Sequence, residues 1–259
     1  MRLHKFIANC GYTSRRRAEL LIQAGRVTVN RKVLTSLGSS VKESDVVEVN
    51  GEVVRLPEPR TIVLHKPPGV ITSTHDTHER LTVMDILPRS LRDAGVLPVG
   101  RLDQDTEGLL ILTNLGDLNH RITHPSFEIE KEYEALVAGQ PSREALRRLE
   151  TGVVIDGRRT SPARVLDASP ASGGTSVRLV IHEGRKRQVR RMCSVIGHEV
   201  LRLRRLRVAG IELGDLPIGA WRALEARELE GLGVDYARMV DGYRKLQASD
   251  EPSERSRRE

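Results

Sequence analysis

The sequence predicts an α+β protein made of two parts. Asn-Gly at residues 50–51 and Asp-Gly at residues 156–157 are turn signals of tight hairpins, and repeated hairpins favour a mixed, mainly antiparallel sheet over a doubly wound parallel one. Apolar residues at helical spacing separate these hairpins. Two prolines and a lack of periodicity mark residues 57–60 as a flexible linker between a small domain, 1–56, and a larger one, 61–240.

Composition indicates a protein with a hydrophobic core that binds a polyanion. The 259 residues are 38% hydrophobic and 30% charged, and the formal net charge is +7. Residues 1–60 carry a net charge of +5 and residues 183–207 a net charge of +7, so the remainder is net acidic. Two separated basic patches favour a nucleic acid held at two points. Neither patch adjoins an amphipathic helix that would favour a membrane surface.

The sequence also argues against export, a disulfide and a metal site. The first residues lack the apolar stretch of a signal peptide, and no uncharged apolar run is long enough to span a membrane, so we expect a cytoplasmic protein. Cys10 and Cys193 fall at core positions of predicted helices and have no CxxC partner. His75, Asp76 and His78 lie in a polar loop without a fourth ligand at fixed spacing, so we expect no metal there.

Residues 1–56 predict two short helices followed by a small sheet. Leu3, Phe6, Ile7 and Cys10 recur on one helical face, a second helix runs from Ser14 to Gly25, and strands follow at 27–29 and 46–49. Arg15, Arg16 and Arg17 occupy the first turn of the second helix, where each cation opposes the helix dipole at a cost of a few tenths of a kcal/mol, up to about 1. Contact with phosphates would offset that cost, so this helix end is predicted to bind a nucleic acid.

The larger part predicts a sheet with flanking helices. A strand at 61–65 ends in the turn Lys66-Pro-Pro-Gly69, and a short apolar run at 109–112 reads as a central strand. Residues 199–208 alternate but carry arginines on both faces, which an edge strand facing a polyanion would tolerate. Trp221 is expected in the core, a terminal helix around 236–243, and a disordered charged tail at 248–259. The remaining expected elements are helices at 117–123, 142–149 and 189–196, and strands at 128–137, 163–166 and 176–182.

The segment with the most chemistry is Gly100-Arg-Leu-Asp-Gln-Asp-Thr-Glu-Gly108, which places Asp103, Asp105 and Glu107 directly before the central strand. A loop held by such a strand can position a reactive group accurately. Three readings are open at this point. The acids could be solvated loop charges, ligands of a magnesium-dependent nuclease, or the start of an EF-hand, although Asn114 stands where that loop needs a bidentate Glu.

Three motifs narrow the choice, because together they resemble the pseudouridine synthases of the RsuA/RluB type. They are Gly100-Arg-Leu-Asp-Gln-Asp-Thr-Glu-Gly-Leu-Leu110, Glu130-Lys-Glu-Tyr133 and Glu183-Gly-Arg-Lys-Arg-Gln-Val-Arg-Arg-Met192. Residues 3–51 resemble the S4 RNA-binding domain, with one departure at Arg31, where that motif commonly has Gly. The resemblance covers the chain to about residue 230.

The resemblance implies that Asp103 is the nucleophile, that Arg190 pairs with it, and that Tyr133 lies against the target base. Arg101 is placed to fill the space that a flipped base vacates, and the Lys66–Gly69 turn is implied to lie near the active site. Isomerising uridine involves no redox change or group transfer, so we expect no cofactor and no metal. The residues expected to bind RNA are Lys5, Arg15, Arg16, Arg17, Arg26, Arg101, Arg187 and Arg191.

The implied substrate is ribosomal RNA, naked or within an assembling particle, and the implied protein is a monomer. Residues 120–126 together with the Glu-Lys-Glu-Tyr motif resemble the RluB branch, which favours 23S over 16S RNA. Two other classes of function stay open. A non-catalytic S4-type ribosome assembly factor would need the basic patches without Asp103, and a metal-dependent nuclease would need Asp105 and Glu107 as ligands.

Overall fold

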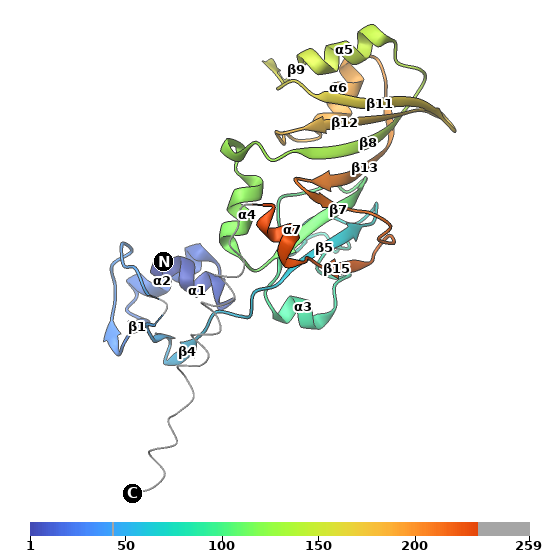
Figure 1. Cartoon of the computed structure of the whole chain (residues 1–259). Helices are drawn as coiled ribbons and strands as arrows, with labels where there is room; N and C mark the ends of the chain where they lie inside the picture. The colour runs from blue at the N-terminus through green and yellow to red at the C-terminus, as the bar shows by residue number, and fades with distance from the viewer. Residues whose placement is uncertain (43, 233–259) are drawn as a thin grey trace, which may run out of the picture.

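Residues 1–42 and 44–232 are described by the structure, a computed structural model, and they form two main sheets and a separate two-stranded hairpin (Figure 1). A four-stranded sheet has the order β2-β1-β3-β4, and a nine-stranded sheet has the main order β11-β12-β8-β13-β7-β5-β15. Strand β13 pairs in parallel with β7 and antiparallel with β8, so the large sheet is mixed. The predicted α+β class is confirmed.

The first part follows the predicted order of elements. Helix α1 (Leu3–Asn9) and helix α2 (Arg15–Gln23) pack their apolar faces on the small sheet through Leu3, Ile7 and Ile22. The Ser14 hydroxyl accepts a hydrogen bond from the Arg17 N–H at 3.3 Å, which caps α2. Asn30 and Arg31 both have positive φ, 51° and 66°, so the first hairpin forms despite the missing Gly. The strands are β1 (Val27–Val29), β2 (Lys32–Val33), β3 (Val47–Val49) and β4 (Glu52–Val54).

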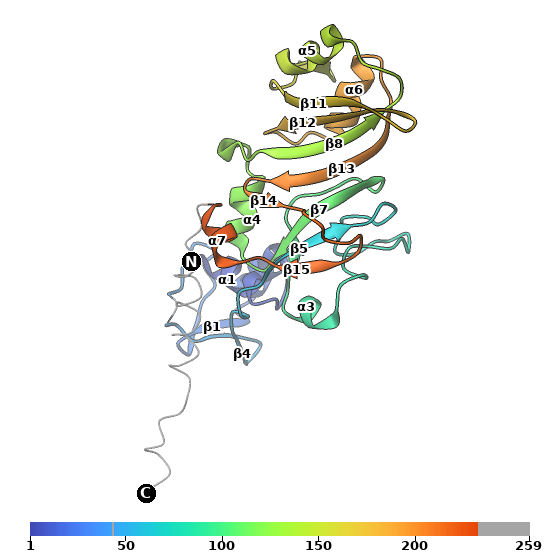
Figure 2. The same cartoon turned by 45° about the vertical axis from the view of Figure 1, so that its right-hand side comes forward.

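The large sheet carries helices on both faces (Figures 1 and 2). Helices α3 (Arg89–Asp93), α5 (Arg143–Thr151) and α6 (Gln188–Val195) share one core with Leu110 and Tyr133, whereas α4 (Gly116–Thr123) and α7 (Ala226–Glu230) cover Leu109 and Ile111 on the other face. A separate hairpin forms around residues 156–157, as predicted. Its strands are β9 (Val154–Ile155) and β10 (Arg158–Arg159), and those of the large sheet are β5 (Thr61–Lys66), β6 (Leu97–Pro98), β7 (Thr106–Thr113), β8 (Lys131–Val137), β11 (Arg164–Ala171), β12 (Gly174–Ile181), β13 (Val200–Val208), β14 (Ile211–Glu212) and β15 (Trp221–Ala223).

Strand β7 begins at Thr106, three residues before the predicted central strand. Its first residues, Thr106 to Gly108, pair with residues 203–205 of β13. Gly108 has a φ of 109°, and a Cβ at this position would lie 2.3 Å from the Arg205 carbonyl oxygen. The motif glycine, Gly108, therefore lets the two backbones approach. Glu107 belongs to the sheet rather than to the loop at residues 99–105, called the acidic loop below because it carries Asp103 and Asp105.

The prediction that β13 is an edge strand is wrong. It lies inside the sheet between β8 and β7, a position that it can occupy because glutamates on or next to those strands neutralise three of its four arginines. Arg204 pairs with Glu134 at 2.9 Å, and Arg207 pairs with both Glu130 and Glu132 at 3.1 Å. These pairs cover the sheet face that no helix covers at β8 and β13, within the described part of the chain.

The junction between the two parts is anchored by Asn114, at the end of β7. Its side-chain oxygen accepts the Arg60 N–H at 2.9 Å, and its amide nitrogen donates to the carbonyls of Glu58 at 2.8 Å and Ala94 at 2.9 Å. Lys5 of α1 also forms an ion pair with Asp117 of α4. The linker that the sequence predicts as a flexible joint is therefore hydrogen-bonded to the large sheet, and a domain boundary at 57–60 stays a prediction.

Two further expectations concern the end of the chain. Trp221 lies on β15, the outermost strand of the large sheet, with 40% of its surface exposed, so the prediction of a core tryptophan is wrong. The terminal helix predicted around 236–243 and the tail at 248–259 lie outside the described residues. Among the residues described, no helix combines the length and apolar character needed to cross a bilayer.

Candidate active site

The acidic loop is held from below by the turn at residues 66–69. Gly69 N–H donates to the Gln104 carbonyl at 2.8 Å, and the Gln104 side chain donates to the Gly69 carbonyl at 3.1 Å. Thr72 fixes the loop from a second side, since its hydroxyl donates to the Leu102 carbonyl at 2.9 Å. These bonds place Asp103 immediately before β7. The turn thus lies next to the acidic loop, where the resemblance implied it would be.

Lys66 is a buried cation beneath this loop. Its side chain is fully buried, and Nζ donates to the Pro67 carbonyl at 2.7 Å and the Gln104 carbonyl at 3.3 Å. Burial lowers the pKa of Lys66 to about 8, although the charges of Asp105, Asp103 and Glu107 oppose this shift. Lys66 therefore ties two carbonyl groups together and adds a positive charge behind the carboxylates.

Asp105, rather than Asp103, receives the arginines of the third motif. Arg187 binds it in a bidentate manner with two distances of 3.0 Å, and Arg190 Nε lies 3.3 Å from Asp105 Oδ2. Burial alone would raise the pKa of Asp105, but the hydrogen bonds from Arg187 and the charges of Arg190 and Arg187 hold that pKa below its usual value. Asp105 is therefore ionised and fully engaged.

The expected ion pair between Arg190 and Asp103 is not formed. Arg190 also donates to the Asp105 carbonyl at 2.9 Å and to the Val200 carbonyl at 3.0 Å, so backbone groups fix its guanidinium beside Asp105. Arg187, which directly precedes α6, reaches the same carboxylate. Sequence spacing alone does not distinguish which of two acids, two residues apart, faces helix α6.

Asp103 lines a cleft with a volume of about 880 Å³. Its carboxylate is half-buried and makes no hydrogen bond or ion pair with another described residue. Arg101, Tyr133 and Arg187 line the same cleft, whereas Arg190 and Arg191 do not. The structure thus brings a free carboxylate, an aromatic ring and two cations together around one space.

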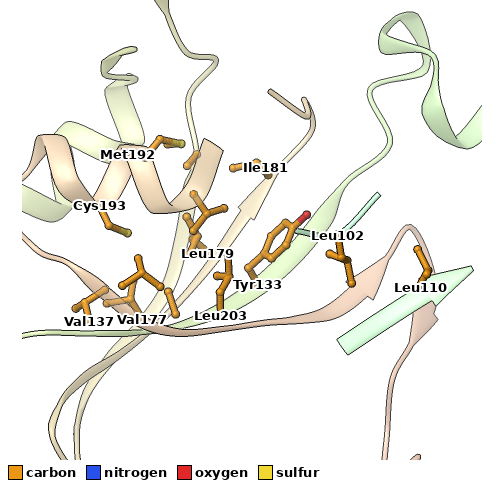
Figure 3. Packing of buried hydrophobic residues seen from close by; sticks show 14 of the residues in the cluster. Leu102, Leu110, Tyr133, Val137, Val177, Leu179, Ile181, Met192, Cys193 and Leu203 are labelled. Atoms are coloured by element: carbon orange, nitrogen blue, oxygen red, sulfur yellow. The ribbon is translucent and has the colours of Figure 1, made fainter. Parts of the chain in front are cut away.

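Tyr133 presents its ring from β8 between the apolar core and the cleft (Figure 3). Only 9% of its surface is exposed, and its hydroxyl lies 3.5 Å from Arg205 Nη1. Arg205 is itself buried and donates to the Leu109 carbonyl at 2.7 Å. Lys131 lies two residues before Tyr133. Its burial and, to a smaller extent, the charge of Arg205 lower its pKa to about 8. The cleft floor therefore combines an aromatic ring with two partly desolvated cations.

Sequence reasoning did not select Lys66, Lys131 or Arg205 as site residues. Lys66 stood in a turn that the resemblance placed near the site, and Lys131 is part of the Glu-Lys-Glu-Tyr motif. Nothing in the sequence distinguishes Arg205 from the other three arginines on β13. Only the structure shows that it is buried, with 4% of its surface exposed.

The residues expected to bind RNA divide into engaged and free groups. Lys5 pairs with Asp117, Arg26 donates to Asn50 at 2.7 Å, and Arg191 pairs with Asp156. Arg15, Arg16, Arg17 and Arg101 are exposed, and their side chains have no hydrogen-bond or ion-pair partner among the described residues. The free group is the better placed to bind phosphates, because its charges are not neutralised.

The other two acids of the motif, Asp105 and Glu107, are not free to bind a metal ion. Glu107 is buried and accepts hydrogen bonds from Arg202 at 3.0 and 2.6 Å, and Asp105 is held by two arginines. Asp76, in the polar loop of the sequence analysis, forms an ion pair with Arg80. In the part of the chain that the structure describes, no three His, Cys, Asp or Glu residues are grouped as metal ligands.

Comparison with known proteins gives consistent matches. Residues 60–195 match the family model described as RNA pseudouridylate synthase, and residues 1–47 match the S4 domain. The chain is 44% identical to "Ribosomal large subunit pseudouridine synthase B" of Bacillus subtilis, over 89% of this chain and 95% of that protein. It is 38% identical to "Dual-specificity RNA pseudouridine synthase RluF" of Escherichia coli, over 93% and 80%. A crystal structure of a pseudouridylate synthase aligns with a TM-score of 0.64 at 30% identity, over 90% of this chain and 99% of that chain.

Proposed function

The chain belongs to the RNA pseudouridylate synthase family, and from this we propose that it isomerises one specific uridine of ribosomal RNA, in the 23S molecule. The observation that carries the proposal is the unpaired Asp103 carboxylate, which faces a cleft beside Tyr133 and Arg101. The relative named as a large-subunit enzyme supports the choice of 23S RNA. We propose that residues 1–56 and 61–240 act as separate domains of a cytoplasmic monomer.

Asp103 has the properties that the first chemical step needs. A carboxylate can attack the sugar or stabilise it while the N1–C1′ bond breaks, as Asp and Glu do in glycosidases. Asp103 has no partner to displace first, and the side chain of Lys66, buried below the loop, adds a positive charge behind it. The released uracil then turns, C5 bonds to C1′, the C5 proton leaves and N1 gains a proton, so the atoms balance without a co-reactant.

The remaining residues would hold the base and the loop. Extruding a base costs a few kcal/mol, and Arg101, exposed at the cleft, could occupy the space left in the RNA. Tyr133 would pack against the flipped uracil, and its hydroxyl is placed to assist removal of the C5 proton. Asp105, Arg187 and Arg190 do not touch the reacting atoms in this proposal. They join the loop before β7 to helix α6 and so position Asp103.

Pseudouridine mapping tests the proposal directly. Purified protein is incubated with 16S and 23S transcripts, and new pseudouridines are located by carbodiimide labelling and reverse transcription. We expect one new stop in the 23S transcript, undiminished in the presence of a chelator. A stop only in 16S RNA would contradict the choice of substrate. RNA binding without any stop, on transcripts and on ribosomal particles, would instead support an assembly factor.

The role of Asp105 gives a first prediction about variants. Asp105→Asn removes the charge that neutralises Arg187 and Arg190, so we expect kcat to fall about 10–100-fold through misplacement of the loop, with RNA affinity retained. Glu107→Gln is the matched control, since its amide oxygen can still accept hydrogen bonds from Arg202. We expect this control to keep nearly full activity. Equal losses in both variants would show that the Asp105 contacts have no special role in positioning.

Substitutions of two arginines test the contributions to RNA binding and to folding separately. Arg16 is exposed without a partner, whereas Arg207 is paired with Glu130 and Glu132. Arg16→Gln should weaken RNA binding and reduce the slope of log affinity against log salt by about 0.7–0.9, with the melting temperature unchanged. Arg207→Gln should lower the free energy of unfolding by about 1–3 kcal/mol and leave the salt slope unchanged. Salt titrations and thermal melts of both variants would reveal the opposite pattern if β13 contacted RNA.

A further inference from the structure

A cluster of three aromatic rings lies beside the cleft, and one of the three, His124, lines it. The rings of His120 and His124 are 4.8 Å apart between centroids and tilted by 32°, and Phe127 meets His120 edge-on at 5.9 Å and His124 at 6.1 Å. The Arg121 guanidinium carbon lies 5.0 Å from the centre of the Phe127 ring. Phe, Tyr and Trp account for only seven residues of the chain, and Phe127 is one of them.

The cluster adjoins the reactive part of the cleft. His124 and Pro125 line the same cleft as Asp103, and so does Ile129 on the far side of the turn. The Thr123 methyl group lies 3.5 Å from where a Cβ of Gly100 would be, next to Arg101. The rings therefore begin at the wall of the cleft, next to Gly100 and Arg101.

The rings are exposed yet held in place. Phe127 is 39% exposed, whereas the other phenylalanine, Phe6, is 6% exposed. His124 Nδ1 accepts the Ser126 N–H at 3.3 Å and lies 2.7 Å from Ser126 Oγ, which fixes the imidazole. The 3₁₀ turn η1 (Pro125–Phe127) is closed by the Glu128 N–H, which donates to the Pro125 carbonyl at 3.1 Å. A rigid, exposed aromatic surface loses little conformational entropy when a ligand binds.

The chemistry of the cluster fits an unpaired nucleobase. Bases stack on Phe, on His and on guanidinium planes, and such stacking tolerates any base because every base has a π-face. We propose that His120, His124 and Phe127 form a stacking subsite for an unpaired base that neighbours the target uridine. This inference rests on the proposed function, because it takes the RNA to be already seated with one base at Asp103.

Binding of a short oligonucleotide tests the subsite without turnover. The probes are a fluorescent twelve-residue oligouridylate and a chain of the same length in which abasic spacers replace every nucleoside. Phe127→Leu should weaken binding of the oligouridylate about 10-fold and leave the abasic chain unchanged. Phe127→Tyr should bind like wild type, because it keeps the ring. Trp221→Leu is the matched control, since Trp221 is as exposed as Phe127 but belongs to the outer strand β15 and not to the cluster, and it should change neither affinity.

Crosslinking supplies a second readout on the wild-type protein. An oligouridylate containing 4-thiouridine should crosslink within residues 122–131, the tryptic peptide that carries His124 and Phe127. Equal effects of Phe127→Leu on both probes, no effect on either, or crosslinks only in other peptides would overturn the subsite. Failure of the proposed function is distinguishable, because it would appear as absent pseudouridine in the transcript assay whatever these binding data show.

Discussion

Asp103→Asn should abolish pseudouridine formation, with a loss of at least about 1000-fold in kcat, while RNA binding is retained. The amide has nearly the same shape as the carboxylate but neither its charge nor its nucleophilicity. Because Asp103 makes no hydrogen bond or ion pair with another described residue, its replacement should not disturb the fold. The loss would therefore report chemistry rather than folding.

The measurement is a rescue experiment in cells that lack this protein. Ribosomal RNA is mapped after expression of wild type, Asp103→Asn or Glu107→Gln, and RNA affinity and melting temperature are measured on the purified proteins. Wild type and Glu107→Gln should restore the missing stop, and Asp103→Asn should not. Restoration by Asp103→Asn would mean that the nucleophile assignment is wrong and would favour the assembly factor.

Gly108→Ala should destabilise the protein by about 3–5 kcal/mol. The new methyl group would lie 2.3 Å from the Arg205 carbonyl oxygen and 2.6 Å from the Arg205 nitrogen, which are backbone atoms that cannot rotate away. The parallel pairing of β7 with β13 would have to open. Because Asp103 and Asp105 lie directly before β7, we expect activity to be lost together with stability.

Gly173→Ala separates the clash from the cost of an unusual backbone angle. Gly173 has a φ of 85°, but a Cβ there would meet no atom within 4 Å. We expect this control to cost about 1–2 kcal/mol and to keep full activity. Denaturant unfolding of both variants gives the comparison, and similar losses would show that backbone strain alone, not contact with β13, explains the need for glycine at position 108.

The sequence predicts where the helices and strands lie more reliably than it predicts which of them lie side by side. Helix α6 follows the apolar spacing of Val189, Met192 and Cys193, which local periodicity reveals. Strand β13 was misjudged because its arginines look solvent-facing until their partners are known, and Glu107, Glu132 and Glu134 lie on other strands. Charge neutralisation across a sheet depends on register, and register depends on contacts distant in sequence.

The site shows the same limit at a finer scale. The motif identified Asp103 as the candidate nucleophile, and the structure places it in the cleft with Tyr133. The partner of Arg190 could not be deduced, because Asp103 and Asp105 are both within reach of a cation from elsewhere, and only the path of the loop decides between them. Lys66 was likewise visible only as part of a turn until its burial was known.

The bonds of Asn114 have a consequence for which uridines the protein can reach. Strand β7 begins three residues after Asp103 and ends directly before Asn114, and at about 3.3 Å per residue its eight residues span roughly 26 Å. Since Asn114 is hydrogen-bonded to Glu58 and Arg60, this strand sets the distance between the Asp103 carboxylate and the point where the S4 domain is attached. A target uridine would then be selected partly by its distance from the RNA segment that the S4 domain holds. Extra residues inserted before Glu58 should alter that selection, whereas the same insertion in the hairpin at residues 172–173 should not.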